Sequence, residues 1–260
     1  RAMPGQMHAI HALLAVQPDA TPFMRHEYLA AMHESGSATP ETGWTPCFLA
    51  MWLGSTTNGR DARELHGVCA VYLKDHSYGE YVFDHAWAHA YRQHGLAYYP
   101  KALVAPPFTP VPGARLLARD ATARLALAQG LVQWCTQSGL SSLHLLFASD
   151  ADIAACRDAK LMLRHNVQFH WTNLQPGYRD FDDFLASLNQ DKRKKIRQER
   201  RKVEQAGVVF RWAQGRDITP SDWDFFYRCY ERTYLEHGNA PYLTRDFFQR
   251  MASNMPENWL

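Results

Sequence analysis

The sequence predicts an α/β (α+β) fold: a mixed β-sheet flanked by helices, followed by the start of a second unit of the same kind. Apolar runs of strand length alternate with helix-periodic segments over the first 165 residues, which is the order that builds a sheet covered by helices. The first two runs have only a turn between them and predict an antiparallel hairpin, whereas helices separate the later runs, so the sheet is expected to be mixed.

Each element of the first half carries a local signal. Thr21 can cap a first helix that has Pro22 in its first turn, and Asp120 can cap a long helix with a regular apolar face. Residues 56–59 have the composition of a turn between the two strands of the hairpin. The predicted helices span residues 21–32, 86–94, 121–137 and 150–159. The predicted strands span residues 47–53, 68–73, 102–105, 143–147 and 162–171.

The pattern restarts after residue 171. Its predicted elements are a helix at 181–188, a strongly basic helix, a strand at 208–212, and two helices that begin near Thr219 and Thr244. The expected domains are a first lobe at 1–165, a linking strand and basic helix at 166–206, and the beginning of a second lobe at 207–260. Because the chain starts without methionine and ends before the second lobe has its strands, we expect a fragment of a longer protein.

Composition excludes several classes of protein. With 46% hydrophobic residues in 260, the chain can bury a large core, and no apolar run reaches the roughly 18–20 residues that span a bilayer. No signal-peptide pattern follows the N-terminus. The five cysteines are scattered without zinc spacing, and the histidines form no ligand pattern. We therefore expect reduced thiols, no metal site and a cytoplasmic protein.

Positive charge is concentrated in one segment. Residues 191–202 contain eight basic and two acidic residues, although the net charge of the whole chain is only +2. Asp191 can cap a helix here. One interpretation is that this helix contacts phosphates, with Arg193, Lys194 and Arg197 as binding residues. The other is a solvated connecting helix whose acidic neighbours lie elsewhere in the fold.

Several longer motifs resemble those of the FemAB-like family. They are residues 77–84 (SYGEYVFD), 98–101 (YYPK), 107–113 (PFTPVPG), 170–173, 178–185, 192–201 and 207–208. The resemblance covers nearly the whole chain. The group that it matches is a bacterial set of predicted N-acyltransferases, described as peptidoglycan biosynthesis or recognition proteins.

The resemblance implies a fold similar to a pair of GNAT acyltransferase lobes, which agrees with the order of elements given above. It also implies the transfer of an amino acid from aminoacyl-tRNA to a peptidoglycan precursor, as characterised FemAB relatives do. A basic helix between two lobes suits a tRNA donor or a nucleotide- or diphosphate-linked acceptor. Residues 110–116 depart from the glycine-rich pyrophosphate loop of acetyl-CoA enzymes, because two prolines remove backbone donors. This departure argues against simple acetyl-CoA binding by the first lobe.

Acyl transfer to an amine requires a base for the amine and a donor that polarises the carbonyl oxygen. Glu80 and Asp84 lie beside aromatic residues, where a carboxylate can have a raised pKa and act as the base; the alternative is a pair of turn or capping acids. Tyr99 can donate to the leaving group, and Lys101 can hold a phosphate. The alternative for these two is a packing aromatic and an exposed lysine.

Further candidates for substrate binding lie elsewhere in the chain. Arg115 falls where a phosphate-binding helix N-terminus would be, with a solvated loop arginine as the alternative. His170, Trp171 and Asn173 are expected either to line the cleft between the lobes or to form a core cluster at a strand end. No Ser-His-Asp or Cys-His arrangement is evident, so direct transfer without a covalent enzyme intermediate is expected.

The sequence is therefore compatible with two functions. The first is an acyl- or aminoacyltransferase with acyl-CoA or aminoacyl-tRNA as its donor substrate and an amine, for example that of a peptidoglycan precursor, as its acceptor. The second is a non-catalytic module that binds RNA or a nucleotide-linked glycan.

Overall fold

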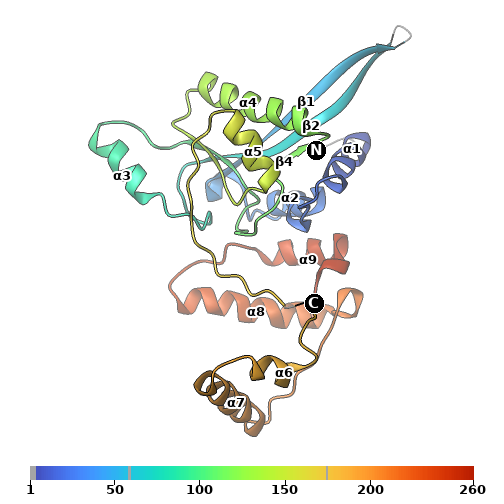
Figure 1. Ribbon diagram of the computed structural model, residues 1–260, viewed down its shortest axis with the longest axis vertical. Helices are drawn as coiled ribbons and strands as arrows, with labels where there is room; N and C mark the ends of the chain where they lie inside the picture. The colour runs from blue at the N-terminus through green and yellow to red at the C-terminus, as the bar shows by residue number, and fades with distance from the viewer. Residues whose placement is uncertain (1–3, 58–59, 174) are drawn as a thin grey trace. The chain divides into compact units, whose positions relative to one another are not determined.

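The computed structural model describes residues 4–57, 60–173 and 175–260, which form two compact units (Figure 1). The first unit combines the chain up to Leu163 with Gln214–Leu260, and the second is Arg164–Ala213. The predicted domains divide the chain differently, at residues 165 and 207. In the structure the last two helices contribute to the core of the first unit, and the beginning of a second lobe after residue 207 stays a prediction.

The first unit is built on a mixed sheet, as predicted. Its strands are β1 (Trp44–Thr57), β2 (Arg60–Lys74), β3 (Lys101–Val104), β4 (Leu116–Ala118) and β5 (Leu143–Leu145). They pair in the order β1-β2-β3-β5, with β4 also paired to β2, and β3 and β5 are the parallel pair. β1 and β2 form a hairpin longer than predicted (Figure 1). The tip of the predicted turn, Asn58 and Gly59, lies outside the described residues.

The helices of the first unit begin largely where their capping residues predict. They are α1 (Pro4–Ala15), α2 (His26–Glu34), α3 (His85–Gln93), α4 (Ala121–Gln137), α5 (Asp150–Asp158), α8 (Pro220–Glu236) and α9 (Arg245–Asn254). Asp120, Thr219 and Thr244 accept hydrogen bonds from the first turns of α4, α8 and α9. The helix predicted at 21–32 is instead a short 3-10 helix followed by α2, because Arg25 between them is extended (φ −68°, ψ 146°).

Helices cover both faces of the sheet. Val71 of β2 packs with α4 and α5 on one face, and Tyr72 packs with α2 and α9 on the other. Alternate residues of a strand point to the same face, so Lys74 shares the face of Tyr72. Lys101 is the direct partner of Lys74 on β3 and lies on this face too. Two lysines therefore meet at the edge of a buried aromatic core.

The second unit contains α6 (Phe181–Ala186) and α7 (Gln190–Gln205), the basic helix. Its cap is Asn189, which accepts a hydrogen bond from the backbone of the first turn, and not Asp191. The strands predicted at 162–171 and 208–212 are absent: both segments lack regular structure. A strand needs a hydrogen-bonded neighbour, and within the described residues of this unit no strand is present to supply one.

None of the helices within the described ranges combines the length and the apolar character needed to cross a membrane.

Candidate functional site

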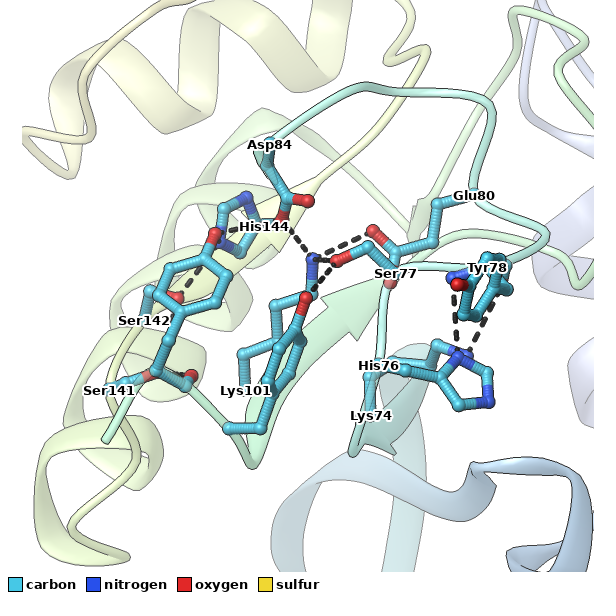
Figure 2. A network of polar contacts seen from close by, with 12 residues as sticks. Lys74, His76, Ser77, Tyr78, Glu80, Asp84, Lys101, Ser141, Ser142 and His144 are labelled. Atoms are coloured by element: carbon cyan, nitrogen blue, oxygen red, sulfur yellow. Dashed lines mark hydrogen bonds and ion pairs between the residues drawn. The ribbon is translucent and has the colours of Figure 1, made fainter. Parts of the chain in front are cut away.

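Three of the sequence motifs meet at one place in the first unit. Glu80 and Asp84 of the first motif contact Lys101 of the second, and Gly79 of the first lies against Phe108 of the third. We use the name Lys101 cluster for Ser77, Glu80, Asp84, Tyr98, Tyr99, Lys101 and His144. Segments far apart in the sequence thus build one polar site at the end of the sheet (Figure 2).

Lys101 lies at the centre of the cluster, at the start of β3, and is fully buried. Its ammonium donates to Ser77 Oγ (2.8 Å) and Glu80 Oε2 (2.8 Å) and makes a short contact with Asp84 Oδ2 (Figure 2). An ammonium group has three donors, so all of them have protein acceptors. Lys101 is therefore not an exposed lysine, and in this conformation its donors bind two carboxylates and a hydroxyl instead of a phosphate.

The local backbone explains how the loop after β2 reaches Lys101. Lys74 ends β2 opposite Lys101, so the loop starts beside it. Gly79 turns the loop with φ +79°, and a Cβ there would lie 2.5 Å from the Phe108 ring; glycine alone meets both demands. Asp84 occupies the N-cap position of α3 but makes no capping hydrogen bond. Its carboxylate instead contacts the buried ammonium.

Hydrogen bonds extend the cluster toward β5. The hydroxyl of Tyr98 donates to Asp84 Oδ2 (2.8 Å) and lies 3.2 Å from His144 Nε2. On the other side, the hydroxyl of Tyr99 lies 2.8 Å from Ser77 Oγ. A continuous series of polar contacts therefore connects the imidazole with the buried ammonium, and each bond in such a series polarises the next.

The two carboxyl groups differ in their proton affinity. Burial raises the pKa of Glu80, and the attraction of Lys101 does not cancel this effect. Burial acts on Asp84 in the same direction, but hydrogen bonds from the lysine, Ser77 and Tyr98 outweigh it and lower the pKa of Asp84. Among the described residues, Glu80 Oε1 and Asp84 Oδ1 are buried and have no hydrogen-bond partner. Neighbouring carboxyl groups with opposite pKa shifts are typical of sites that divide acid and base roles.

Lys74 and His144 belong to this site, although the sequence analysis did not single them out. The Lys74 ammonium lies 3.7 Å from the centroid of the Trp44 ring and 3.4 Å from the carbonyl oxygen of Tyr78. Burial lowers the pKa of Lys74 to about 7, against the attraction of nearby Glu80. The sequence did contain a signal for both: each is a polar residue in, or directly after, an apolar run of strand length. Such residues are rarely buried without a partner.

Arg115 has a structural role that differs from the prediction. It precedes β4 and not a helix N-terminus, and its side chain is fully buried. Its Nε donates to the carbonyl oxygen of Leu146 (3.0 Å) and its Nη2 to that of Val111. The backbone N–H of Arg115 donates to Asp152 Oδ2 (2.6 Å). The guanidinium therefore connects two loops, and the interpretation as a solvated loop arginine is wrong.

His170, Trp171 and Asn173 belong to the second unit, in a segment without regular structure. His170 Nε2 lies 3.2 Å from Gln168 Oε1, and Asn173 Oδ1 accepts a hydrogen bond from the backbone of Tyr178 (3.2 Å). Trp171 is 68% exposed. The interpretation as a core cluster at a strand end is therefore wrong, and substrate binding by these residues stays a prediction.

The three basic residues predicted to bind an anion have different environments on α7. Arg193 Nη1 lies 3.1–3.4 Å from three carbonyl oxygens at and just after the end of α6, so it caps that helix. Arg197 Nη2 lies 3.6 Å from Asp182 Oδ1. Lys194 is exposed, and within the described part of the chain no carboxylate forms an ion pair with it. Anion binding by these three residues stays a prediction.

Comparison with known proteins gives a match to one family. The model of the FemAB-like family, described as peptidoglycan biosynthesis/recognition, matches residues 7–260. The searches of curated proteins and of solved structures give no match. The match covers both units and includes every residue of the Lys101 cluster.

Proposed function

The chain belongs to the FemAB-like family, and from this premise we propose that it transfers an acyl or aminoacyl group to an amine of a peptidoglycan precursor or a related acceptor. The observation that carries the proposal is the Lys101 cluster. There, Glu80 has a raised pKa and an unpaired oxygen, and it lies beside a lysine, a second carboxylate and hydroxyl donors. These are the groups that acyl transfer to an amine requires.

Glu80 is the base in the proposed reaction. The neutral amine of the acceptor attacks the carbonyl carbon of the donor, an aminoacyl ester or an acyl thioester, and Glu80 takes one proton from its nitrogen. The bond between that carbon and the leaving oxygen or sulfur then breaks. The tRNA hydroxyl or the CoA thiol leaves with the proton that the nitrogen lost, and the acceptor becomes an amide. Tyr99 donates a hydrogen bond to the leaving oxygen or sulfur as that bond breaks.

Lys101 and Asp84 are positioning residues in this proposal. Lys101 holds one oxygen of each carboxylate and leaves the other oxygen of Glu80 for the incoming amine. Asp84 contacts the Lys101 ammonium, and the Tyr98 hydroxyl donates to the same Asp84 oxygen and holds it in place. Because the free oxygens are buried, the acceptor reaches them when the loop at 77–84 moves. Tyr78 and Phe83 on this loop are 68% and 76% exposed, so the contacts that such a movement must break are chiefly the ion pairs of Glu80 and Asp84 with Lys101.

The basic helix α7 supports a donor that carries phosphates. The exposed lysines of this helix are the side chains of the protein best suited to bind the phosphates of a tRNA backbone or the diphosphate of a nucleotide. A binding surface for a polyanion and a site for amine chemistry are the two parts that an aminoacyl-tRNA-dependent transferase needs.

The proposal is tested by supplying the chain with aminoacyl-tRNA or acyl-CoA together with an amine-bearing muropeptide and measuring the amide product by mass spectrometry. Glu80→Gln should slow product formation strongly, whereas Asp75→Asn, at a side chain that is 66% exposed on the same loop, should not. If neither donor gives a product, or if Glu80→Gln reacts at the native rate, the proposal is wrong.

A non-catalytic binding module is the second candidate, and one observation favours it. In this conformation every donor of Lys101 is satisfied, and the carboxylates are closed to solvent, which is how a purely structural ion pair also looks. A binding module would keep its affinity for RNA or for a nucleotide-linked glycan when Glu80 is replaced by glutamine, and it would form no amide.

A further inference from the structure

Four tyrosines gather beside the Lys101 cluster in the first unit. Tyr78 and Tyr81 lie on the loop at 77–84, and Tyr234 and Tyr242 come from the end of α8 and the segment after it. The ring of Tyr242 stacks on Phe108, with centroids 4.8 Å apart and 14° between the planes. Tyr234 meets Tyr242 edge to face at 5.6 Å. We use the name tyrosine cluster for Tyr78, Tyr81, Tyr234 and Tyr242.

The two segments meet at the Phe108 ring, which stacks on Tyr242 and lies against Gly79 of the loop. Burial raises the pKa of Tyr81, and the phenols of Tyr234 and Tyr242 add to this effect. Burial also raises the pKa of Tyr242, with further contributions from Tyr234 and Tyr78. Nevertheless, Tyr78 is 68% exposed and Tyr81 is 45% exposed. The cluster is therefore open to solvent and is not a filled part of the core.

The backbone holds two aromatic residues in a strained conformation here. Tyr81 has φ +58° and Phe108 has φ +57°, in the left-handed region that bulky residues avoid. Phe108 is packed between Trp44 and Tyr242, which offsets its strain. The ring of Tyr81 is 45% exposed, so less packing offsets its strain. Strained positions of this kind cluster at ligand-binding sites.

The chemistry of the cluster suits a neutral ring with several hydroxyl groups. The four side chains carry no charge, so they offer nothing specific to a phosphate or a carboxylate. Each offers an apolar ring face and a phenol that both donates and accepts hydrogen bonds. A pyranose has complementary parts, because its C–H faces stack on aromatic rings and its hydroxyl groups hydrogen-bond to phenols.

We propose that the tyrosine cluster is a binding site for a sugar ring of the acceptor. This inference rests on the proposed function and names the part of the acceptor that this surface recognises. Because Tyr81 directly follows Glu80 in the chain, a sugar held here brings its substituents next to the base. Movement of the loop at 77–84 would then couple sugar binding to exposure of the carboxylate.

The test measures binding of a short N-acetylglucosamine oligosaccharide by calorimetry and by saturation-transfer NMR. The informative variant is Tyr81→Asn, because asparagine tolerates the left-handed conformation and the change removes the ring without adding strain. We expect binding at least about tenfold weaker, with a free energy of unfolding equal to or above that of the native chain. Tyr242→Ala should also lose binding. Phe225→Ala on α8, at a side chain that is 63% exposed, is the matched control and should bind normally.

The outcomes separate this inference from the proposed function. If the native chain does not bind the oligosaccharide, or if Tyr81→Asn binds as tightly as the native chain, the sugar site is wrong. Amide formation that is slowed by Glu80→Gln would then still support the transferase. Conversely, oligosaccharide binding that is lost in Tyr81→Asn, in a chain that forms no amide with any donor, supports the sugar site and contradicts the transferase.

Discussion

Lys74 and Lys101 are direct partners across the β2–β3 ladder, and both are fully buried. Like charges in directly opposed positions destabilise a sheet. Lys101 has two carboxylate partners, whereas among the described residues the Lys74 ammonium directly contacts a carbonyl oxygen and the face of Trp44. The two lysines therefore have different tasks: one organises the acidic groups, and the other is a buried amine that loses its proton readily.

The first prediction concerns the pH dependence of stability. Burial lowers the pKa of Lys74 in the folded protein to about 7, below its ordinary value of 10.5 in the unfolded chain. Between these values the unfolded state binds more protons, so the free energy of unfolding rises with pH, by at most about 1.4 kcal/mol per unit. Below pH 7 both states are protonated and the contribution of Lys74 is constant.

Lys74→Met should flatten this rise, as measured by urea unfolding at several pH values from about 7 to 10. Lys192→Met, at an exposed position of α7, is the control and should keep the native slope. Equal slopes for the native chain and Lys74→Met would show that the buried amine is not the titrating group.

The second prediction concerns the two carboxylates. Glu80→Gln should reduce the rate of amide formation by about 10²–10⁴-fold, since it removes the base. In the native chain the rate should rise with pH through a pKa above the ordinary value for glutamate, because burial raises the pKa of Glu80. The variant should lose this rise. A native pH profile in Glu80→Gln would assign the titration to another group.

The third prediction concerns the stability of the buried ion cluster. Lys101→Met leaves two carboxylates without their cation and should lower the free energy of unfolding by about 3–5 kcal/mol. The triple variant Lys101→Met, Glu80→Gln, Asp84→Asn removes every formal charge of this group and should be more stable than the single variant. Urea unfolding measures both. A single variant as stable as the native chain would mean that the cluster is hydrated in solution.

The fourth prediction concerns the basic helix. Lys192→Glu with Lys194→Glu should weaken tRNA binding and make it less dependent on salt, because fewer counterions are released. Arg193→Gln should instead reduce stability, since Arg193 caps the end of α6. Arg157→Glu with Arg92→Glu, two exposed charge reversals on α5 and α3, changes the net charge by the same amount and is the control. If it weakens binding as much as the variant on α7, α7 has no special role.

Much of the fold was predictable because its signals are local. Asp120 caps its helix as expected, and the last two helices begin at Thr219 and Thr244 as predicted, since such signals join groups only two or three residues apart. The long helix at 121–137 has the predicted bounds. The strands predicted at 162–171 and 208–212 did not form, because strand propensity without a hydrogen-bonded neighbour does not make a sheet.

The candidate site was predictable in part. The motifs pointed to Glu80, Asp84, Tyr99 and Lys101, and the structure brings these residues together. The burial of Lys101 was not foreseen, because the sequence around a lysine does not show how many distant groups surround it. The same limit applied to Arg115, whose carbonyl partner on Leu146 lies 31 positions along the chain.

The sequence alone determined the alternation of strands and helices, the capped helix starts, the concentration of charge on α7 and the motifs of the FemAB-like family. These features depend on neighbours in the chain or on the identity of a few residues. Tertiary packing decided which lysine would bind two carboxylates, which would become a buried amine beside Trp44, and which tyrosines would share one surface. Those outcomes depend on desolvation and on contacts between distant segments, and both exist only after the sheet and its helices have packed.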